Sequence, residues 1–381
     1  MKYKDYNIQV FFNLLRAGLF PVHGEGNSDI RIDGTTDWNC IYQLAQEQSV
    51  QGLVLQGIDW FKVHDSGFTV PQVLLLQWIG EVQMIEQRNK EMNAFVANLI
   101  EKLRRNDIYA ILVKGQGIAQ CYERPLWRSC GDVDLYLSDD NYQQAKNLLI
   151  PIADSVAPEG VYEKHLELNI DNWTVELHGY LRCGLSTRMD RGLDELHKAV
   201  FCGGDVRSWM NGKTQVFLPG ADCDVIFVFT HFLKHFYLGG LGIRQICDWS
   251  RLLWTCRSKL DIRLLERRIR QMGLMAEWKA FGAFAVEYLG MPKEAMPFFS
   301  PEKKWKRKAD KICAFILEVG NMGHNRDGSY FDNHPYVIRK AMSLARRCGD
   351  LIHHSRMFPL DSLRFFPNIV FHGLSAAARG E

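Results

Sequence analysis

The spacing of apolar residues changes twice along the chain, and this change limits the fold more than any other feature of the sequence. Apolar residues recur at helical spacing in residues 38–56 and 82–107. Between residues 108 and 220 the chain instead contains short β-rich and alternating runs, which are typical of strands. Helical spacing returns after the Leu-Pro-Gly stretch at 218–220. The pattern predicts an α+β protein.

These transitions also predict the domain organisation. We expect a helical N-terminal region, a central core that mixes strands and helices, a helical lobe, and a looser connection leading to a basic C-terminal helix, at residues 1–107, 108–220, 221–294 and 295–381. A chain of 381 residues with 47% hydrophobic residues can fill sizeable cores in these regions.

Charge and composition exclude several classes of protein. The chain has 46 Lys and Arg against 44 Asp and Glu, so its net charge of +2 gives no general attraction to nucleic acid or membrane. No stretch offers 18 charge-free apolar residues, and the N-terminus lacks the pattern of a signal peptide. We expect a cytoplasmic protein without membrane insertion. The ten cysteines form no C-x-x-C pair, which favours reduced, mostly buried thiols.

Asp132 and Asp134 stand one residue apart at the start of a strand-like run. Residues two apart on a strand share a face, so both carboxylates can reach one site. Like charges about 4 Å apart repel by roughly 4 kcal/mol at an effective dielectric of 20, which predicts a cation nearby. Asp222 and Asp224 repeat the spacing at the start of a helical run. There we expect a helix N-cap and a first-turn acid, without a metal.

A third carboxylate is expected on a neighbouring strand. Residues 165–181 contain two strand-like runs joined by Asp171 and Asn172, a pair suited to a tight hairpin turn. In the second run Glu176 and His178 share a face. Three carboxylates on adjacent strands are the oxygen ligands that a pair of Mg²⁺ or Mn²⁺ ions requires. His178 is either a candidate near an acceptor or a simple hydrogen-bonding partner.

A run upstream of the carboxylates predicts a phosphate contact. Residues 109–115 read as a strand that ends at Lys114 and Gly115, before a helix start. Such a turn presents backbone N–H groups to phosphate, and Lys114 adds a positive charge. Arg128 is a second candidate for this contact. The residues match neither the P-loop pattern nor the dinucleotide-binding glycine pattern.

Two further pairs stand four residues apart on predicted helices. His231 and His235 lack the H-E-x-x-H arrangement of a zinc site, so we favour a packed helix face, one that can line a cleft against the catalytic region. Arg244 and Asp248 are expected to form an ion pair within their helix or to bridge to those histidines. Neither pair receives a catalytic role.

Together, "LVKGQGIAQCYERPLWRSCGDVDLYL" and the later "VELH" resemble the uncharacterised nucleotidyltransferase family of the DNA polymerase β-like superfamily. The helical segments on either side are also similar to that family. The resemblance implies a polymerase β-like core, a small mixed sheet with flanking helices, in which Asp132, Asp134 and Glu176 hold two divalent ions. A nucleoside triphosphate would be the donor, and pyrophosphate would leave. Many superfamily members have Gly-Ser where this chain has Lys114-Gly115-Gln116.

Two other functions compete with nucleotidyl transfer. A D-x-D glycosyltransferase also binds a nucleotide-linked donor through a divalent ion, but it gives no role to Glu176 or to the Lys-Gly turn. A catalytically inactive nucleotide-binding module would keep the fold without the reaction. The acceptor is left open between an RNA end, a protein side chain, a sugar phosphate and a small hydroxyl compound. The basic segment 339–356 is expected to pack one helix face with its charges in solvent.

Overall fold

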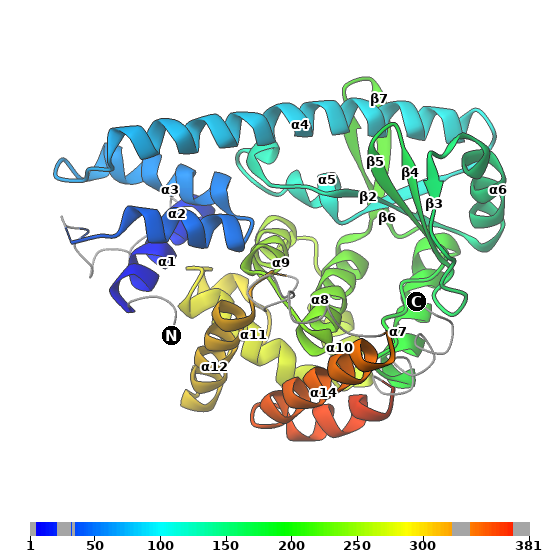
Figure 1. The fold of residues 1–381 in the computed structure, drawn as a ribbon. Helices are drawn as coiled ribbons and strands as arrows, with labels where there is room; N and C mark the ends of the chain where they lie inside the picture. Colours follow the sequence, from blue (N-terminus) through cyan, green and yellow to red (C-terminus); the bar gives the residue numbers. More distant parts are fainter. Residues whose placement is uncertain (1–4, 21–31, 33–34, 322–335, 369–381) are drawn as a thin grey trace.

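The computed structural model describes residues 5–20, 32, 35–321 and 336–368, and these residues form a mixed sheet with helices on both faces (Figure 1). The α-helices are α1 (Asp5–Leu19), α2 (Trp38–Glu47), α3 (Gln51–His64), α4 (Gln72–Arg104), α5 (Gly115–Ala119), α6 (Asp139–Leu149), α7 (Thr187–Phe201), α8 (Ala221–Leu238), α9 (Ile243–Cys256), α10 (Ile262–Met272), α11 (Met275–Glu287), α12 (Lys303–Val319) and α14 (Tyr336–Ser355). Residues 359–368 are also helical. The 3₁₀ helices are η2 (Pro125–Trp127), η3 (Ile150–Ile152) and η4 (Lys293–Ala295).

Seven strands form the sheet in the order β3-β4-β5-β2-β1-β7-β6. Their bounds are β1 (Ala110–Val113), β2 (Asp132–Leu137), β3 (Ser155–Val156), β4 (His165–Ile170), β5 (Trp173–His178), β6 (Val206–Asn211) and β7 (Thr214–Pro219). The pairs β2/β5 and β1/β7 are parallel, whereas the other neighbours are antiparallel. The predicted combination of a mixed sheet and flanking helices is therefore confirmed.

The hairpin predicted between β4 and β5 is confirmed. Asp171 and Asn172 have φ angles of 51° and 66°. A two-residue hairpin turn of type I′ needs positive φ at both central residues, and Asn and Asp tolerate this conformation better than most residues. The turn fixes the register, so that His165 lies opposite His178 across the two strands.

The alternation of each strand divides its side chains between two cores. On β2, Val133, Leu135 and Leu137 pack in the core that also contains the second half of α4 and part of α6. Tyr136 belongs to the other core, which includes residues of α7, α8 and α9. Asp132 and Asp134 have the parity of Tyr136, so they face the helical lobe rather than α4.

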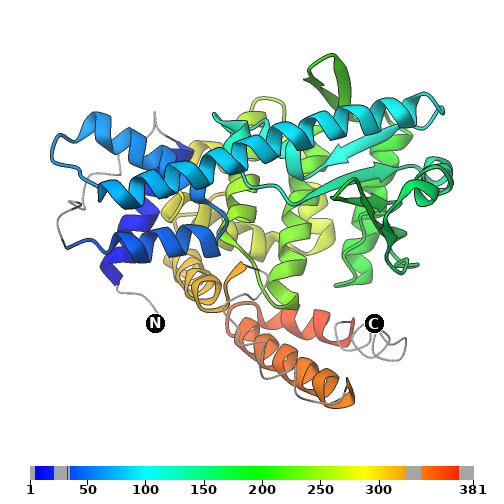
Figure 2. The same cartoon turned by 45° about the horizontal axis from the view of Figure 1, so that its top comes forward.

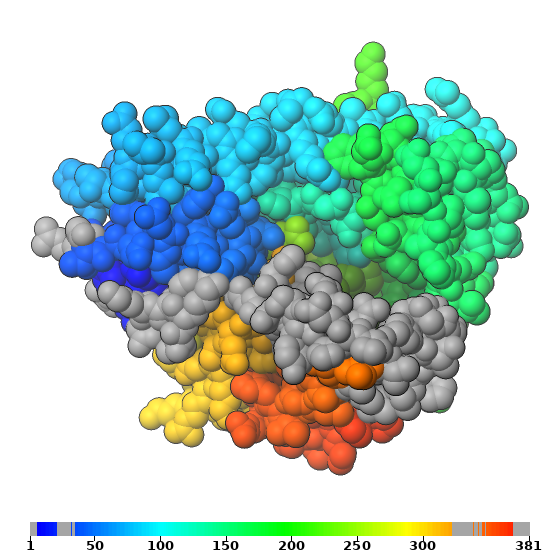
Figure 3. Space-filling model, in the orientation of Figure 1, coloured from blue at the N-terminus to red at the C-terminus, as the bar shows by residue number. Residues whose placement is uncertain are grey.

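The long helix α4 lies within the predicted N-terminal region, but it packs against both the N-terminal helices and the sheet. It runs along the edge of the molecule from the N-terminal helices to the sheet (Figure 1; Figure 2). Met92, Val96 and Leu99 pack in the core of the sheet, whereas Leu74 and Trp78 pack with the N-terminal helices. In the space-filling view, side chains close the gaps between these parts (Figure 3).

The C-terminal third contains more helix than predicted. The expected looser connection at 295–334 contains α12, a helix of 17 residues. Its apolar residues at helical spacing, among them Ile312, Phe315 and Ile316, are buried against the helical lobe, so the flanking Pro and Gly residues limit the helix without preventing it. The predicted basic C-terminal helix is present as α14. Among the described residues, no helix is long and apolar enough to cross a membrane.

The second D-x-D pair has structural roles, although the predicted cap is wrong. Gly220 is the N-cap of α8, because the helix begins two residues earlier than the carboxylates suggested. Asp222 instead accepts a hydrogen bond from the backbone N–H of Asp261. Asp224, the predicted first-turn acid, is buried and paired with Arg207 at 2.5 Å.

Candidate active site

The three predicted carboxylates meet where β2 and β5 run side by side. The parallel register places Asp134 opposite Glu176, with Asp132 two residues before Asp134 on the same face. Each of the three residues offers a carboxylate oxygen within 4.8 Å of the others. Asp134 is fully buried. This arrangement requires compensation, because buried carboxylates are stable only when cations or hydrogen-bond donors surround them.

Lys114 supplies positive charge at the centre of this carboxylate group. Its Nζ lies 2.5 Å from Asp134 Oδ1 and 3.8 Å from Glu176 Oε2. The side chain comes from the junction of β1 and α5, where the lysine has φ 56° and ψ −145°. A residue other than glycine is strained in this conformation by roughly 1–3 kcal/mol. The fold holds Lys114 there together with Gly115, whose φ is also positive at 36°.

Two histidines complete the polar surroundings of Glu176. His178 Nε2 lies 2.9 Å from Asp134 Oδ1 and 3.3 Å from Glu176 Oε2. His165 Nε2 approaches the same Glu176 oxygen to 3.2 Å from the neighbouring strand. His178 thus lies among the carboxylates. His165 was not predicted from the sequence.

The charges in the group shift one another's pKa values. Burial raises the pKa of Asp134, as does the charge of Asp132, and the cation of Lys114 offsets this only in part, leaving a pKa of about 6. Burial also disfavours the charged form of Glu176, but hydrogen bonds from His165 and His178 reverse the shift and hold its pKa well below its usual value. Burial lowers the pKa of Lys114, yet the charges of the three carboxylates outweigh it and raise that pKa overall.

The carboxylate oxygens fit a divalent cation. Among the described residues, no hydrogen-bond donor reaches Asp134 Oδ2, although this atom is buried. A buried acceptor without a partner costs about 1–3 kcal/mol, and more when charged. An orphaned oxygen beside two further carboxylates is a donor set suited to the hard cations Mg²⁺ and Mn²⁺.

Arg128 lies at the edge of the same cavity, but Asp248 of α9 holds its guanidinium. Arg128 Nε and Nη2 each donate to one Asp248 oxygen at 2.7 Å. Tyr122 donates to the same carboxylate, also at 2.7 Å. The predicted pairing of Arg244 with Asp248, or with the histidines, is therefore wrong. Arg244 instead donates to the backbone oxygen of Ser129, because α9 packs against the loop before β2.

That loop is held from both sides of the sheet. Asn89, on α4, donates to the backbone oxygens of Leu126 and Arg128 at 2.7 and 2.8 Å. Gln116 of α5 in turn donates to Asn89 Oδ1 at 2.8 Å. The hydrogen bonds from α4 and those from α9 fix the chain just before Asp132. They position the first two carboxylates without touching them.

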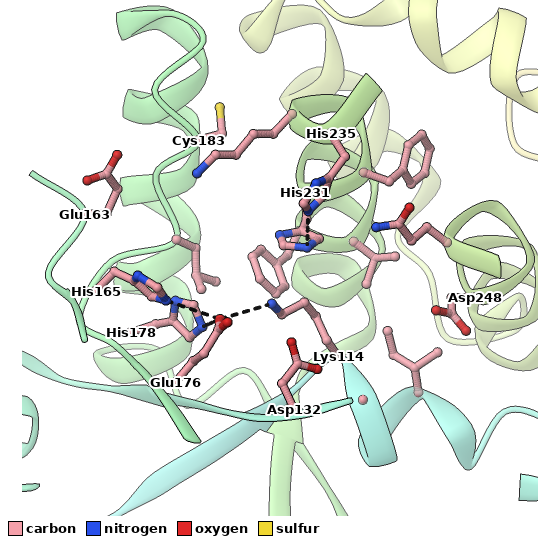
Figure 4. Close-up of a pocket in the computed structure, with 18 of the residues that line it drawn as sticks. Lys114, Asp132, Glu163, His165, Glu176, His178, Cys183, His231, His235 and Asp248 are labelled. Atoms are coloured by element: carbon pink, nitrogen blue, oxygen red, sulfur yellow. Dashed lines mark hydrogen bonds and ion pairs between the residues drawn. The ribbon is translucent and has the colours of Figure 1, made fainter. Parts of the chain in front are cut away.

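A cavity of about 490 Å³ opens between these strands and the helical lobe. His231 and His235 of α8 lie across it from Lys114 and Glu176 (Figure 4). Their Nε2 atoms lie 3.2 Å apart. The prediction that they line a cleft against the catalytic region is confirmed. Burial and the charge of Lys114 lower the pKa of both rings, to about 4 for His235, so they are neutral at pH 7.

Several lining residues carry charge but were not predicted. Cationic side chains from three directions line the cavity, namely Arg182, Lys234 and Arg244. No local motif marks them, because each comes from a different element or loop and gains its position from tertiary packing. Lys114 and Gly115 line the cavity as well. Helix α5, however, has only five residues. The helix dipole at the predicted phosphate turn is therefore small.

One of three comparisons with known proteins found a match. A family model described as an uncharacterised nucleotidyltransferase matches residues 34–290, about two thirds of the chain. The matched span contains every residue that lines the cavity. Searches of curated proteins and of solved structures found no match.

Proposed function

Because the chain belongs to the uncharacterised nucleotidyltransferase family, we propose that it transfers a nucleoside monophosphate from a nucleoside triphosphate to an acceptor and releases pyrophosphate. The observation that carries this proposal is the meeting of Asp132, Asp134 and Glu176 on two parallel strands. A polymerase β-like arrangement of the core is part of the proposal, and the mixed sheet supports it.

The metal dependence follows from the donor set. Asp132, Asp134 and Glu176 would hold one or two divalent ions, Mg²⁺ or Mn²⁺. Such ions stabilise charge on a transferring phosphoryl group and on its leaving group. Asp134 Oδ2, which has no hydrogen-bond partner among the described residues, supports a cation at this point.

The chain's own residues bind and orient the substrates. Lys114, Lys234 and Arg244 give the cavity the positive charge that a triphosphate requires. Since Asp248 engages two nitrogens of Arg128, we assign Arg128 to positioning the loop before Asp132 rather than to direct contact with phosphate. Gly115 allows close approach at the turn, because a Cβ there would lie 3.3 Å from the backbone oxygen of Asp132.

The reaction needs no side-chain nucleophile. An acceptor hydroxyl forms a bond to the α-phosphorus, and the bond from that phosphorus to the bridging oxygen breaks. The hydroxyl proton passes to solvent, and pyrophosphate leaves. His231 and His235, neutral and opposite the carboxylates, offer hydrogen bonds to the acceptor. A volume of about 490 Å³ lies in the range of about 300–1,000 Å³ typical of small-molecule sites.

The test combines binding and turnover. Each of the four nucleoside triphosphates, labelled at the γ-phosphate, is incubated with the protein and Mg²⁺ or Mn²⁺, and the release of labelled pyrophosphate is measured. We expect release from at least one triphosphate and its loss in Glu176→Gln. Glu195→Gln is the matched control, since Glu195 is an exposed residue of α7 whose side chain is 68% accessible.

Two outcomes would overturn the proposal. Turnover of nucleotide sugars alone would assign a glycosyltransferase. A thermal shift with a non-hydrolysable triphosphate and Mn²⁺, without pyrophosphate release by the wild-type protein, would assign an inactive binding module.

A further inference from the structure

We propose that His165, Glu176 and His178 form a second cation site, selective for transition-metal ions such as Zn²⁺ or Co²⁺. This site adjoins the carboxylate group and shares Glu176 with it. The inference stands on the positions of these three side chains and does not require nucleotidyl transfer.

Two of the three spacings between the donor atoms match a tetrahedral ion. Tetrahedral bonds of about 2.0–2.1 Å to nitrogen and oxygen place two ligand atoms about 3.3 Å apart. Glu176 Oε2 lies 3.2 Å from His165 Nε2 and 3.3 Å from His178 Nε2. All three atoms lie within 4.8 Å of one another. Little movement is needed to bind an ion.

The hairpin makes this arrangement rigid. His165 and His178 are directly opposite each other in the β4/β5 register, and Glu176 lies two residues before His178 on the same face. Their imidazole rings lie 4.8 Å apart at 33°, and both point toward Glu176 (Figure 4). Because a two-residue turn sets the register, the three ligands are positioned by local structure.

The donor set selects the class of metal. Two imidazole nitrogens and one carboxylate oxygen suit Zn²⁺ and Co²⁺, whereas Mg²⁺ and Mn²⁺ are better suited to oxygen ligands. The His165 side chain is 36% exposed, so an ion can enter from solvent. A fourth position is open to water or to a substrate oxygen, as in catalytic rather than structural zinc sites.

Sharing of Glu176 couples the two sites. One carboxylate has two oxygens, and two-metal sites with ions about 3.5–4 Å apart commonly use such a bridge. An ion held by the histidines would therefore add positive charge at Glu176, next to the carboxylate group. It also replaces the hydrogen bonds that His165 and His178 now make to that residue.

The test uses Co²⁺ as an optical probe on the full chain, without nucleotide and after treatment with EDTA. We expect visible absorption from a four- or five-coordinate Co²⁺ with nitrogen ligands, displaced by Zn²⁺ but not by excess Mg²⁺. His165→Ala and His178→Ala should each weaken this binding at least tenfold. His64→Ala is the matched control, because His64 is an exposed residue of α3 far from Glu176 in sequence and fold.

A further variant separates this inference from the proposed function. Asp132→Asn removes a carboxylate from the first group but leaves both histidines, so it should abolish pyrophosphate release and retain the Co²⁺ spectrum. Equal Co²⁺ affinity in wild type, His165→Ala and His178→Ala would overturn the site, whatever the turnover assay gives. Circular dichroism checks that each variant folds. If His165→Ala does not fold, His165→Gln replaces it.

Discussion

Replacement of Lys114 by methionine tests whether a cation at the carboxylate group stabilises the fold. The methionine keeps most of the apolar stem but removes the ammonium, which lies 2.5 Å from Asp134 Oδ1. Asp134 is 0% exposed and Lys114 13% exposed, so water cannot replace the lost partner. At an effective dielectric of 20, Coulomb's law gives about 7 kcal/mol for charges at this distance, as an upper limit.

The expected loss of stability is smaller than this limit. Removing one partner of a buried ion pair costs about 3–5 kcal/mol. At about 2.1 cal/mol/K per residue, unfolding of 381 residues has an entropy of about 0.8 kcal/mol/K, so the melting temperature should fall by about 4–6 °C. The loss should shrink as pH is lowered from 8 to 5, because a protonated Asp134 no longer needs a cation.

Divalent ions give the decisive comparison. Melting is measured in EDTA and in Mn²⁺ for wild type, Lys114→Met and the control Lys198→Met, whose ion pair with Glu195 is exposed. Mn²⁺ at 100 times its dissociation constant should raise the free energy of unfolding of Lys114→Met by about 2.7 kcal/mol. Wild type should gain less, because Lys114 competes with the ion. The reasoning is refuted if Lys114→Met has the same melting temperature as Lys198→Met in EDTA. It is also refuted if Mn²⁺ stabilises Lys114→Met no more than it stabilises wild type.

Two further predictions concern pH and the hairpin. His235 has a pKa of about 4 in the folded protein against about 6.5 unfolded, so the unfolded chain binds more protons between these values and about 3 kcal/mol of stability is lost as pH falls from 6.5 to 4. In His235→Asn this part of the loss should disappear from urea titrations across that range, and an unchanged pH profile would contradict it. Asn172→Ala should lower the free energy of unfolding by about 1 kcal/mol, because alanine is strained at φ 66°. The same change at Asn147 on the surface of α6 should have an effect within about 0.5 kcal/mol, and equal losses at both positions would rule out turn strain as the cause.

Local patterns predicted the part of the site that lies on β2 and β5. The alternation of β2 and β5 was sufficient to place Asp132, Asp134 and Glu176 on common faces. The Asp171-Asn172 turn carried a further signal that was not used. A two-residue turn pairs residue 170 with 173 and therefore His165 with His178, so the register alone could have added His165 to the site.

Long-range pairing accounts for what the sequence did not predict. Arg128 and Asp248 are 120 residues apart, and their contact depends on how α9 packs against the loop before β2. A spacing of four residues therefore suggested the wrong partner for Asp248. Lys114 was expected at phosphate, and its place beside Asp134 depends on the antiparallel register of β1 with β2.

Helix α4 determines which part of this chain can fold independently. At about 1.5 Å per residue its 33 residues span about 50 Å, enough to reach from the N-terminal helices to the far side of the sheet. A fragment cut at residue 108 would lose Asn89 and expose to water the part of the sheet's apolar face that α4 covers. Recombination or design cannot exchange the sheet as an independent unit, because the exchanged segment must include the helix that precedes it.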